Sequence, residues 1–254
     1  MISLRITDLC KRFGGIIALE DVSMQLKPNQ VTAIIGPNGS GKTTLFNAIA
    51  GYVSIDGGSI YLEESGSPTW KTIDTLKPHQ VAKHGIGVLF QEVNVFQRLT
   101  ALENVCVGVQ SQIGESPWIT VFNYYSVKKQ EKIVRRKGME LLEFVGLENR
   151  SQSLASELSF GQQKLVSFAR LLAGNPSVLL LDEPTAGLHA EMINTLSKLL
   201  RHLSHEGKTV VVIEHNLELV EQLASVVYLI VGGRVQSFGN TQDVLKRLQS
   251  NQTN

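Results

Sequence analysis

The chain has 254 residues, of which 43% are hydrophobic, so it can bury a sizeable core as one large domain or as a domain with a subdomain. Its 24 basic and 23 acidic residues leave a net charge of +1. No strong overall field therefore directs it to nucleic acid or to an anionic membrane surface. The two cysteines, Cys10 and Cys106, lack metal-site spacing and indicate incidental thiols in a reducing compartment.

No membrane-directing segment is evident. The first residues run into Asp8, Lys11 and Arg12 without the apolar stretch of a signal peptide. The most apolar run near the end, Val226–Val231, is far shorter than the ~20 residues of a membrane span. We therefore expect a soluble protein whose membrane role, if it has one, comes through a partner.

The first part of the chain predicts strands separated by glycine turns. Short strands over residues 2–9 and 22–26 flank the turn Phe13-Gly14-Gly15. The continuous apolar run Val31–Ile35 is typical of a strand buried on both faces of a sheet, and a helix follows near Lys42. Further strands are predicted over residues 59–62 and 87–90, and the polar stretch 63–71 favours a surface hairpin or loop.

From about residue 93 the pattern becomes helical. Thr100 and Glu103 match a capping box, and residues 128–145 form a charged segment with apolar residues at helical spacing. Between them lies an aromatic group, which packs the subdomain or docks a membrane partner's helix: Trp118, Phe122, Tyr124 and Tyr125.

Three more apolar strands, over residues 178–181, 209–213 and 226–231, alternate with helices, which indicates a mainly parallel α/β sheet. The expected single domain has a nucleotide-binding core of 1–91 and 159–240, with an N-terminal antiparallel β subdomain, a helical subdomain of 92–158, and a C-terminal helix and tail of 241–254.

The strongest motif is Gly36-Pro37-Asn38-Gly39-Ser40-Gly41-Lys42-Thr43-Thr44, which lies between the strand 31–35 and a helix. This is the setting in which G-x-x-x-x-G-K-[ST] indicates a phosphate-binding loop. Glycines let several N–H groups point at one anion, and the helix start adds its positive dipole. Lys42 can reach the β- and γ-phosphates, and the Thr43 hydroxyl can bind Mg²⁺.

A second motif is the apolar run 178–181 followed by Asp182-Glu183. Parallel sheets bind ligands at the C-terminal ends of their strands. Asp182 there can hold Mg²⁺, and Glu183 can polarise a water that attacks the γ-phosphate. Without the phosphate-binding loop the pair would equally indicate a solvated acidic turn.

The segment Ser159-Phe160-Gly161-Gln162-Gln163 precedes a helical run, and Ser159 can be its N-cap. Because it stands before the Asp182-Glu183 strand, it resembles the L-S-G-G-Q signature of ATP-binding-cassette (ABC) ATPases. Single residues then match that family in order: Phe13 for adenine stacking, Gln91 for the Q-loop, and His215 for the switch histidine. Taken singly, these would be a core aromatic, a surface glutamine and a helix-start residue.

Within the family the motifs look like the branched-chain amino-acid importer group, with urea and lipopolysaccharide-export ATPases as near relatives. Two residues depart from the common pattern. Phe160 replaces the second signature residue, usually glycine, and narrows the space for a γ-phosphate. The segment Ala186-Gly187-Leu188-His189 is in the family's D-loop position, and His189 stands where many members have Asp. This departure affects the D-loop contacts rather than nucleotide binding.

The resemblance implies that two cassettes bind ATP and Mg²⁺ head to tail. The loop 36–44 of one chain would face Ser159, Gly161 and Gln162 of the other, whether identical or paralogous. Glu183 and His215 would then act on the γ-phosphate with Lys42, and Gln91 would sense it and Mg²⁺. Catalytic roles fall to Glu183, His215, Lys42 and Gln91, and metal binding to Thr43, Gln91 and Asp182.

The implied function is ATP hydrolysis that powers integral-membrane permease subunits from the cytoplasmic face of the inner membrane, most simply in an importer. Export of lipopolysaccharide type is the alternative. A soluble ABC ATPase of repair, translation or assembly is disfavoured by the single phosphate loop, the insertion of modest length and the near-zero net charge, which also argues against nucleic acid.

Overall fold

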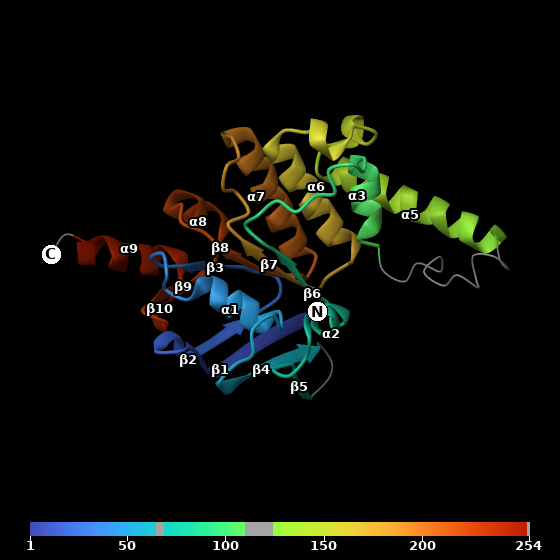
Figure 1. Cartoon of the computed structure of the whole chain (residues 1–254). Helices are drawn as coiled ribbons and strands as arrows, with labels where there is room; N and C mark the ends of the chain where they lie inside the picture. Colours follow the sequence, from blue (N-terminus) through green and yellow to red (C-terminus); the bar gives the residue numbers. More distant parts are fainter. Residues whose placement is uncertain (65–68, 110–123, 253–254) are drawn as a thin grey trace. The chain divides into compact units, whose positions relative to one another are not determined.

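The computed structural model describes residues 1–64, 69–109 and 124–252 and divides into two compact units. The first contains Met1–Gln91, Pro176–Ala186 and Leu200–Asn254, and the second contains Glu92–Asn175 and Gly187–Leu199. Figure 1 labels their elements along the chain. The fold is the expected α/β arrangement, with one mainly parallel and one antiparallel sheet.

The larger sheet of the first unit has six strands in the order β10-β9-β3-β8-β7-β6, all parallel except β10, which runs antiparallel to β9. Its strands are β3 (Val31–Ile35), β6 (Ile86–Leu89), β7 (Val178–Asp182), β8 (Thr209–Ile213), β9 (Val226–Val231) and β10 (Arg234–Asn240). Every residue of β3, β7 and β8 is buried. The continuous apolar runs therefore predicted these central strands correctly.

The smaller sheet has four antiparallel strands in the order β2-β1-β4-β5. They are β1 (Ile2–Phe13), β2 (Ile16–Leu26), β4 (Gly57–Glu64) and β5 (Trp70–Thr72). The first two strands are longer than the sequence predicted, because register shifts between Ile6 and Leu9 and between Leu9 and Lys11 break the alternation of apolar residues. The hairpin turn at Gly14-Gly15 is where it was predicted.

One apolar cluster joins the two sheets through the helix α1 (Lys42–Ile49). Phe46 and Ile49 of α1 belong to it, together with Ile60 of β4 and Leu180 of β7. Burial of this helix between strands from both sheets holds the loop that precedes it. The remaining elements of this unit are α2 (Pro78–Lys83), α8 (Leu217–Leu223) and α9 (Thr241–Gln252).

The second unit is helical, with α3 (Ala101–Val107), α5 (Tyr124–Phe144), α6 (Phe160–Ala173), and the short turns η2 (Glu148–Arg150) and η3 (Ala155–Glu157). The helix α7 (Ala190–His205) begins in it. The Thr100 cap is confirmed, since its side chain accepts from the Glu103 N–H and its own N–H donates to the Glu103 carboxylate at 2.8 Å. Asn104, fully buried, bonds the backbone of Phe96 in both directions.

This unit reaches further than the expected 92–158. The helix α6 packs against α3 and α5, so it lies with the helical unit and not with the sheet. The sequence did not predict α2 or β10. Of these, α2 is six residues long with only Val81 buried, and β10 is an edge strand with no fully buried residue. Neither leaves a strong periodic pattern.

The predicted aromatic group lies outside what the structure describes: Trp118 and Phe122 are not among the described residues, and the side chains of Tyr124 and Tyr125 are not described. No helix within residues 1–64, 69–109 and 124–252 has both the length and the hydropathy of a bilayer span.

The central strand β7 offers a test of the core. Leu180 is fully buried in the cluster that joins the sheets, so Leu180→Ala should lower the free energy of unfolding by about 2–5 kcal/mol through lost burial and a cavity. Ile16, 72% exposed at the hairpin, is the matched control, and Ile16→Ala should stay within about 0.5 kcal/mol. Urea unfolding would measure both, and equal effects would contradict this placement of the core.

Candidate nucleotide site

The predicted phosphate-binding loop connects β3 to α1, and its glycines are required by geometry. Gly36 has φ +151°, and a Cβ there would lie 2.0 Å from the Ile230 carbonyl oxygen. Gly41 has φ +102°, and a Cβ there would lie 2.3 Å from the Ala18 carbonyl oxygen. The backbone of β2 and β9 therefore packs directly on the loop, and only glycine fits at these two positions.

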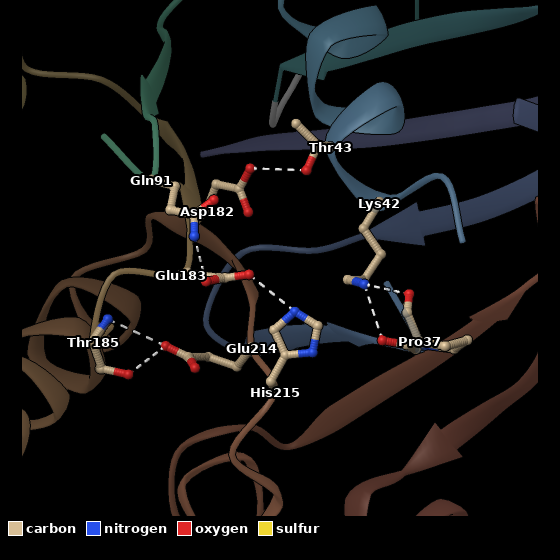
Figure 2. Close-up of polar contacts among 10 residues, drawn as sticks. Pro37, Lys42, Thr43, Gln91, Asp182, Glu183, Thr185, Glu214 and His215 are labelled. Carbon is tan, nitrogen blue, oxygen red and sulfur yellow. Dashed lines mark hydrogen bonds and ion pairs between the residues drawn. The ribbon is translucent and has the colours of Figure 1, made fainter. Parts of the chain in front are cut away.

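Lys42 curls back over its own loop. Its Nζ donates to the carbonyl oxygens of Gly36 and Pro37, both at 2.9 Å (Figure 2). Burial lowers the pKa of Lys42, while the carboxylates of Glu183 and Asp182 oppose that shift. A cation held by neutral carbonyls in a desolvated loop is an anion-binding arrangement, because a phosphate oxygen would supply the missing negative charge.

Thr43 and Asp182 meet beside this loop. The Thr43 hydroxyl donates to Asp182 Oδ2 at 3.1 Å, and Asp182, at the end of β7, is 4% exposed. Burial raises the pKa of Asp182, and the Thr43 hydrogen bond opposes that rise. A hydroxyl and a carboxylate are hard oxygen ligands, and a pair of protein ligands completed by substrate phosphates and water suits Mg²⁺. The donor set therefore fits the expected metal.

Glu183 is the centre of the site. It has φ +46°, a rare conformation for a residue other than glycine, and its N–H donates to the Ile213 carbonyl at 3.0 Å. Gln91 Nε2 donates to Glu183 Oε2 and His215 Nε2 contacts Glu183 Oε1, both at 2.9 Å. Figure 2 shows the two side chains approaching the carboxylate from opposite sides. Three predicted residues that follow the ends of β6, β7 and β8 thus converge on one point.

Phe13 ends β1 with 49% of its surface exposed, as a stacking platform for a base requires. Asp56 anchors the end of this strand. Its carboxylate accepts from the Arg12 N–H at 2.7 Å and pairs with Lys11 Nζ at 3.0 Å, and Lys11 lies 5.3 Å from the centre of the Phe13 ring. The Arg12 N–H, followed by the Lys11 hydrogen bond, lowers the pKa of Asp56.

The predicted signature residues lie in the helical unit, at the start of α6. Ser159 is the N-cap: its side chain accepts from the Gln162 N–H at 3.3 Å, and its N–H donates to Gln162 Oε1 at 3.0 Å. A Cβ on Gly161 would lie 2.5 Å from Met192 Sδ, so a larger residue there would have to displace the flexible end of the Met192 side chain. A capped helix start with a glycine in its first turn is suited to an anion.

The two departures from the family pattern lie close together within the same unit. The Phe160 ring is 52% exposed and rests on Gly187 of the D-loop, where a Cβ would be 2.8 Å from a ring carbon. His189 is exposed and its carbonyl accepts from the Ile193 N–H at the start of α7. The ring of Phe160 is thus placed against the D-loop of its own unit.

Most candidate residues that share the first unit are brought together in space. They are Lys42, Thr43, Gln91, Asp182, Glu183 and His215. Ser159, Gly161 and Gln162 belong to the other, helical unit. The sequence reading assigned no role to Glu214 and Thr185, which form a buried pair beside the site. The available signal was a carboxylate at the end of a wholly apolar strand.

Comparison with known proteins agrees with this geometry. Residues 19–186 match the family model described as ABC transporter. The probable branched-chain amino acid transport ATP-binding protein LivG of Methanocaldococcus jannaschii is 34% identical over 247 residues, which are 97% of this chain and 93% of that protein.

Two solved structures are similar over nearly the whole chain. An ATP-binding cassette of an ABC transporter in its ADP conformation has a TM-score of 0.81 and 34% identity, and the match covers 98% of this chain and 95% of that one. A dimeric cassette in a post-hydrolysis state, bound to ADP and Pi, has a TM-score of 0.76 and 27% identity, with 94% and 98% covered.

The loop itself provides a matched pair of substitutions. Gly36→Ala must move the loop or β9, because its Cβ meets the Ile230 carbonyl. At Gly39, φ is +76° but no atom lies within 4 Å, so Gly39→Ala carries only the backbone cost of about 1–2 kcal/mol. We expect Gly36→Ala to lower the thermal unfolding temperature more and to abolish ATP binding. If calorimetry shows that Gly39→Ala lowers the unfolding temperature more than Gly36→Ala does, then contact with β9 does not constrain the conformation of the loop.

Proposed function

Because this chain belongs to the ABC transporter family, we propose that it is the ATP-binding and ATP-hydrolysing subunit that powers a membrane importer of the branched-chain amino-acid type. The observation that carries the proposal is the convergence of Gln91 and His215 on Glu183, beside the Thr43–Asp182 pair. This arrangement can hold a nucleoside triphosphate and direct a water at its terminal phosphate.

For binding, the loop Gly36–Thr44 surrounds the phosphates with backbone N–H groups. Lys42 exchanges its two carbonyl partners for phosphate oxygens, a change from neutral to charged acceptors that strengthens its hydrogen bonds. Phe13 stacks on the adenine ring. Thr43 and Asp182, with Gln91, are the residues that would hold Mg²⁺, which when bound offsets charge on the phosphate oxygens.

For hydrolysis, Glu183 is the base that orients the attacking water and accepts its proton. His215 holds one carboxylate oxygen of Glu183 at 2.9 Å and stabilises the charge that develops on the γ-phosphate. Gln91 donates a hydrogen bond to the other carboxylate oxygen of Glu183. It lies just after β6 and immediately before Glu92, the first residue of the helical unit. A change at the γ-phosphate can therefore reach that unit through Gln91.

The site needs a second cassette in this proposal. Ser159, Gly161 and Gln162 would meet the phosphate loop of a partner chain, identical or paralogous, as the dimeric state of the similar cassette suggests. Bound ATP would then stabilise the pair by mass action, and its hydrolysis would release it. Integral-membrane permeases are the further partners, with this chain peripheral at the cytoplasmic face of the inner membrane.

The choice of cargo rests on the relatives. The probable LivG protein of M. jannaschii is named for branched-chain amino acid transport, and the match spans nearly its full length. The high-affinity branched-chain amino acid transport ATP-binding protein LivG of Escherichia coli K12 is 30% identical, with 96% of each chain covered. An exporter ATPase of the lipopolysaccharide type is the second candidate, since both groups share these motifs.

Substitution of the base tests the chemistry. Glu183→Gln keeps the shape of the side chain but removes its proton affinity, so ATP hydrolysis should fall by about 100-fold or more. ATP binding should persist and a nucleotide-trapped dimer should accumulate. Lys42→Ala should instead weaken ATP affinity by about tenfold or more, since it removes a charged donor. Steady-state ATPase rates, ATP titrations and gel filtration separate the two, and wild-type turnover in Glu183→Gln would refute the assignment.

Membrane coupling is tested by co-purification. The tagged chain should bring down two integral-membrane subunits from a detergent extract, and uptake of radiolabelled leucine into reconstituted vesicles should require ATP. Lys42→Ala is the control that should assemble without driving uptake. Copurification of a permease that moves lipopolysaccharide outward would favour the exporter, and full activity with no membrane subunit would exclude transport.

A further inference from the structure

Glu214 is a buried carboxylate that the proposed chemistry leaves without a role. It follows β8, whose five residues are all buried, and is itself only 4% exposed. The ion pairs found among the described residues do not include it. Burying a carboxylic acid without a paired cation costs free energy. Glu214 therefore needs hydrogen-bond partners, and its burial calls for a functional explanation.

Its partner is Thr185. Glu214 Oε1 accepts from the Thr185 hydroxyl at 2.6 Å and from the Thr185 N–H at 3.3 Å, as Figure 2 shows. Burial raises the pKa of Glu214, whereas the Thr185 hydroxyl and the backbone N–H groups of Thr185 and His215 favour the ionised form. One oxygen therefore holds the chain just beyond β7 to the chain just beyond β8.

The position of this pair relates it to the catalytic residues. Thr185 lies two residues after Glu183, and Glu214 immediately precedes His215. On the other side of His215, the Asn216 side chain accepts from the Leu219 N–H at 3.2 Å and caps α8. The backbone of His215 is thus anchored on both sides, although its own ring is at the surface.

We propose that Glu214 is a positioning residue for ATP hydrolysis, which acts through Thr185 to hold the His215 ring in contact with the Glu183 carboxylate. The proposal rests on the functions proposed above for Glu183 and His215. Glu214 itself does not touch the nucleotide. Its contribution is to fix the separation of two strand ends, so that the 2.9 Å contact between His215 and Glu183 survives while the γ-phosphate changes charge.

Four variants separate the parts of this pair. Glu214→Ala removes the acceptor, and Thr185→Val removes the hydroxyl while the carboxylate stays. Glu214→Gln keeps an acceptor oxygen, and Thr185→Ser keeps the hydroxyl. We expect kcat to fall about 10- to 100-fold in Glu214→Ala, in line with an ångström-scale misplacement, and to fall less in Thr185→Val. Thr185→Ser should restore most of the rate, and Glu214→Gln part of it.

The affinity for ATP and the unfolding temperature serve as the structural readouts. ATP affinity should stay within about threefold in all four variants, because the side-chain hydrogen bonds found for the pair among the described residues do not involve the phosphate loop. Glu218, exposed in the first turn of α8, is the matched control, and Glu218→Ala should leave kcat unchanged. If Glu214→Ala does not fold, Thr185→Val against Thr185→Ser carries the comparison. A parallel loss of ATP affinity and folding would show a merely structural role and overturn the proposal.

A double-mutant cycle with His215→Ala gives the decisive result. If Glu214 acts through His215, then Glu214→Ala in the His215→Ala background should lower kcat by less than about threefold more, because the ring that it positions is gone. If the two reductions multiply, the inference is wrong while the role of His215 stands. If His215→Ala alone has wild-type turnover, the proposed function of His215 fails, and the inference falls with it.

Discussion

The register of the parallel strands is the constraint on which the site depends. Leu89 pairs with Leu181, Asp182 with Ile213, and Ile34 with Ile213. The chain therefore leaves four neighbouring strands at one level. Within two residues of each strand end lies a residue of the site: Gly36, Gln91, Glu183 or His215. A slip of one residue in any pairing would turn these side chains to the opposite face.

Desolvated charge is the second physical theme of the site. Burial lowers the pKa of Lys42 and raises those of Asp182 and Glu214, so desolvation disfavours the charged form of all three groups. Lys42 donates hydrogen bonds to carbonyl oxygens, and Asp182 accepts one from a hydroxyl. These neutral groups are weaker hydrogen-bond partners than ions of opposite charge. In the proposed function, a bound nucleotide with its metal would supply both counter-charges.

In the helical unit, the signature residues are held by helix capping and by side-chain packing rather than by strand register. The Ser159 cap and the close packing at Gly161 hold the start of α6, and Phe160 is turned onto Gly187 of the D-loop. The substitution of an aromatic residue for the usual signature glycine is therefore matched by a glycine beneath the ring. In the proposed function these residues meet the phosphate loop of a second cassette.

The sequence by itself determined the phosphate loop, the three buried central strands, the carboxylates at the end of β7 and the Thr100 and Ser159 caps, because each depends on neighbours within about five residues. It could not determine the division between units, since α6 is assigned by its packing on α3 and α5. Nor could it place Phe160 on Gly187 or pair Glu214 with Thr185, because these contacts join separate segments. Strand register decided the site: local periodicity predicts which residues form a strand, but only tertiary packing decides which strand ends meet.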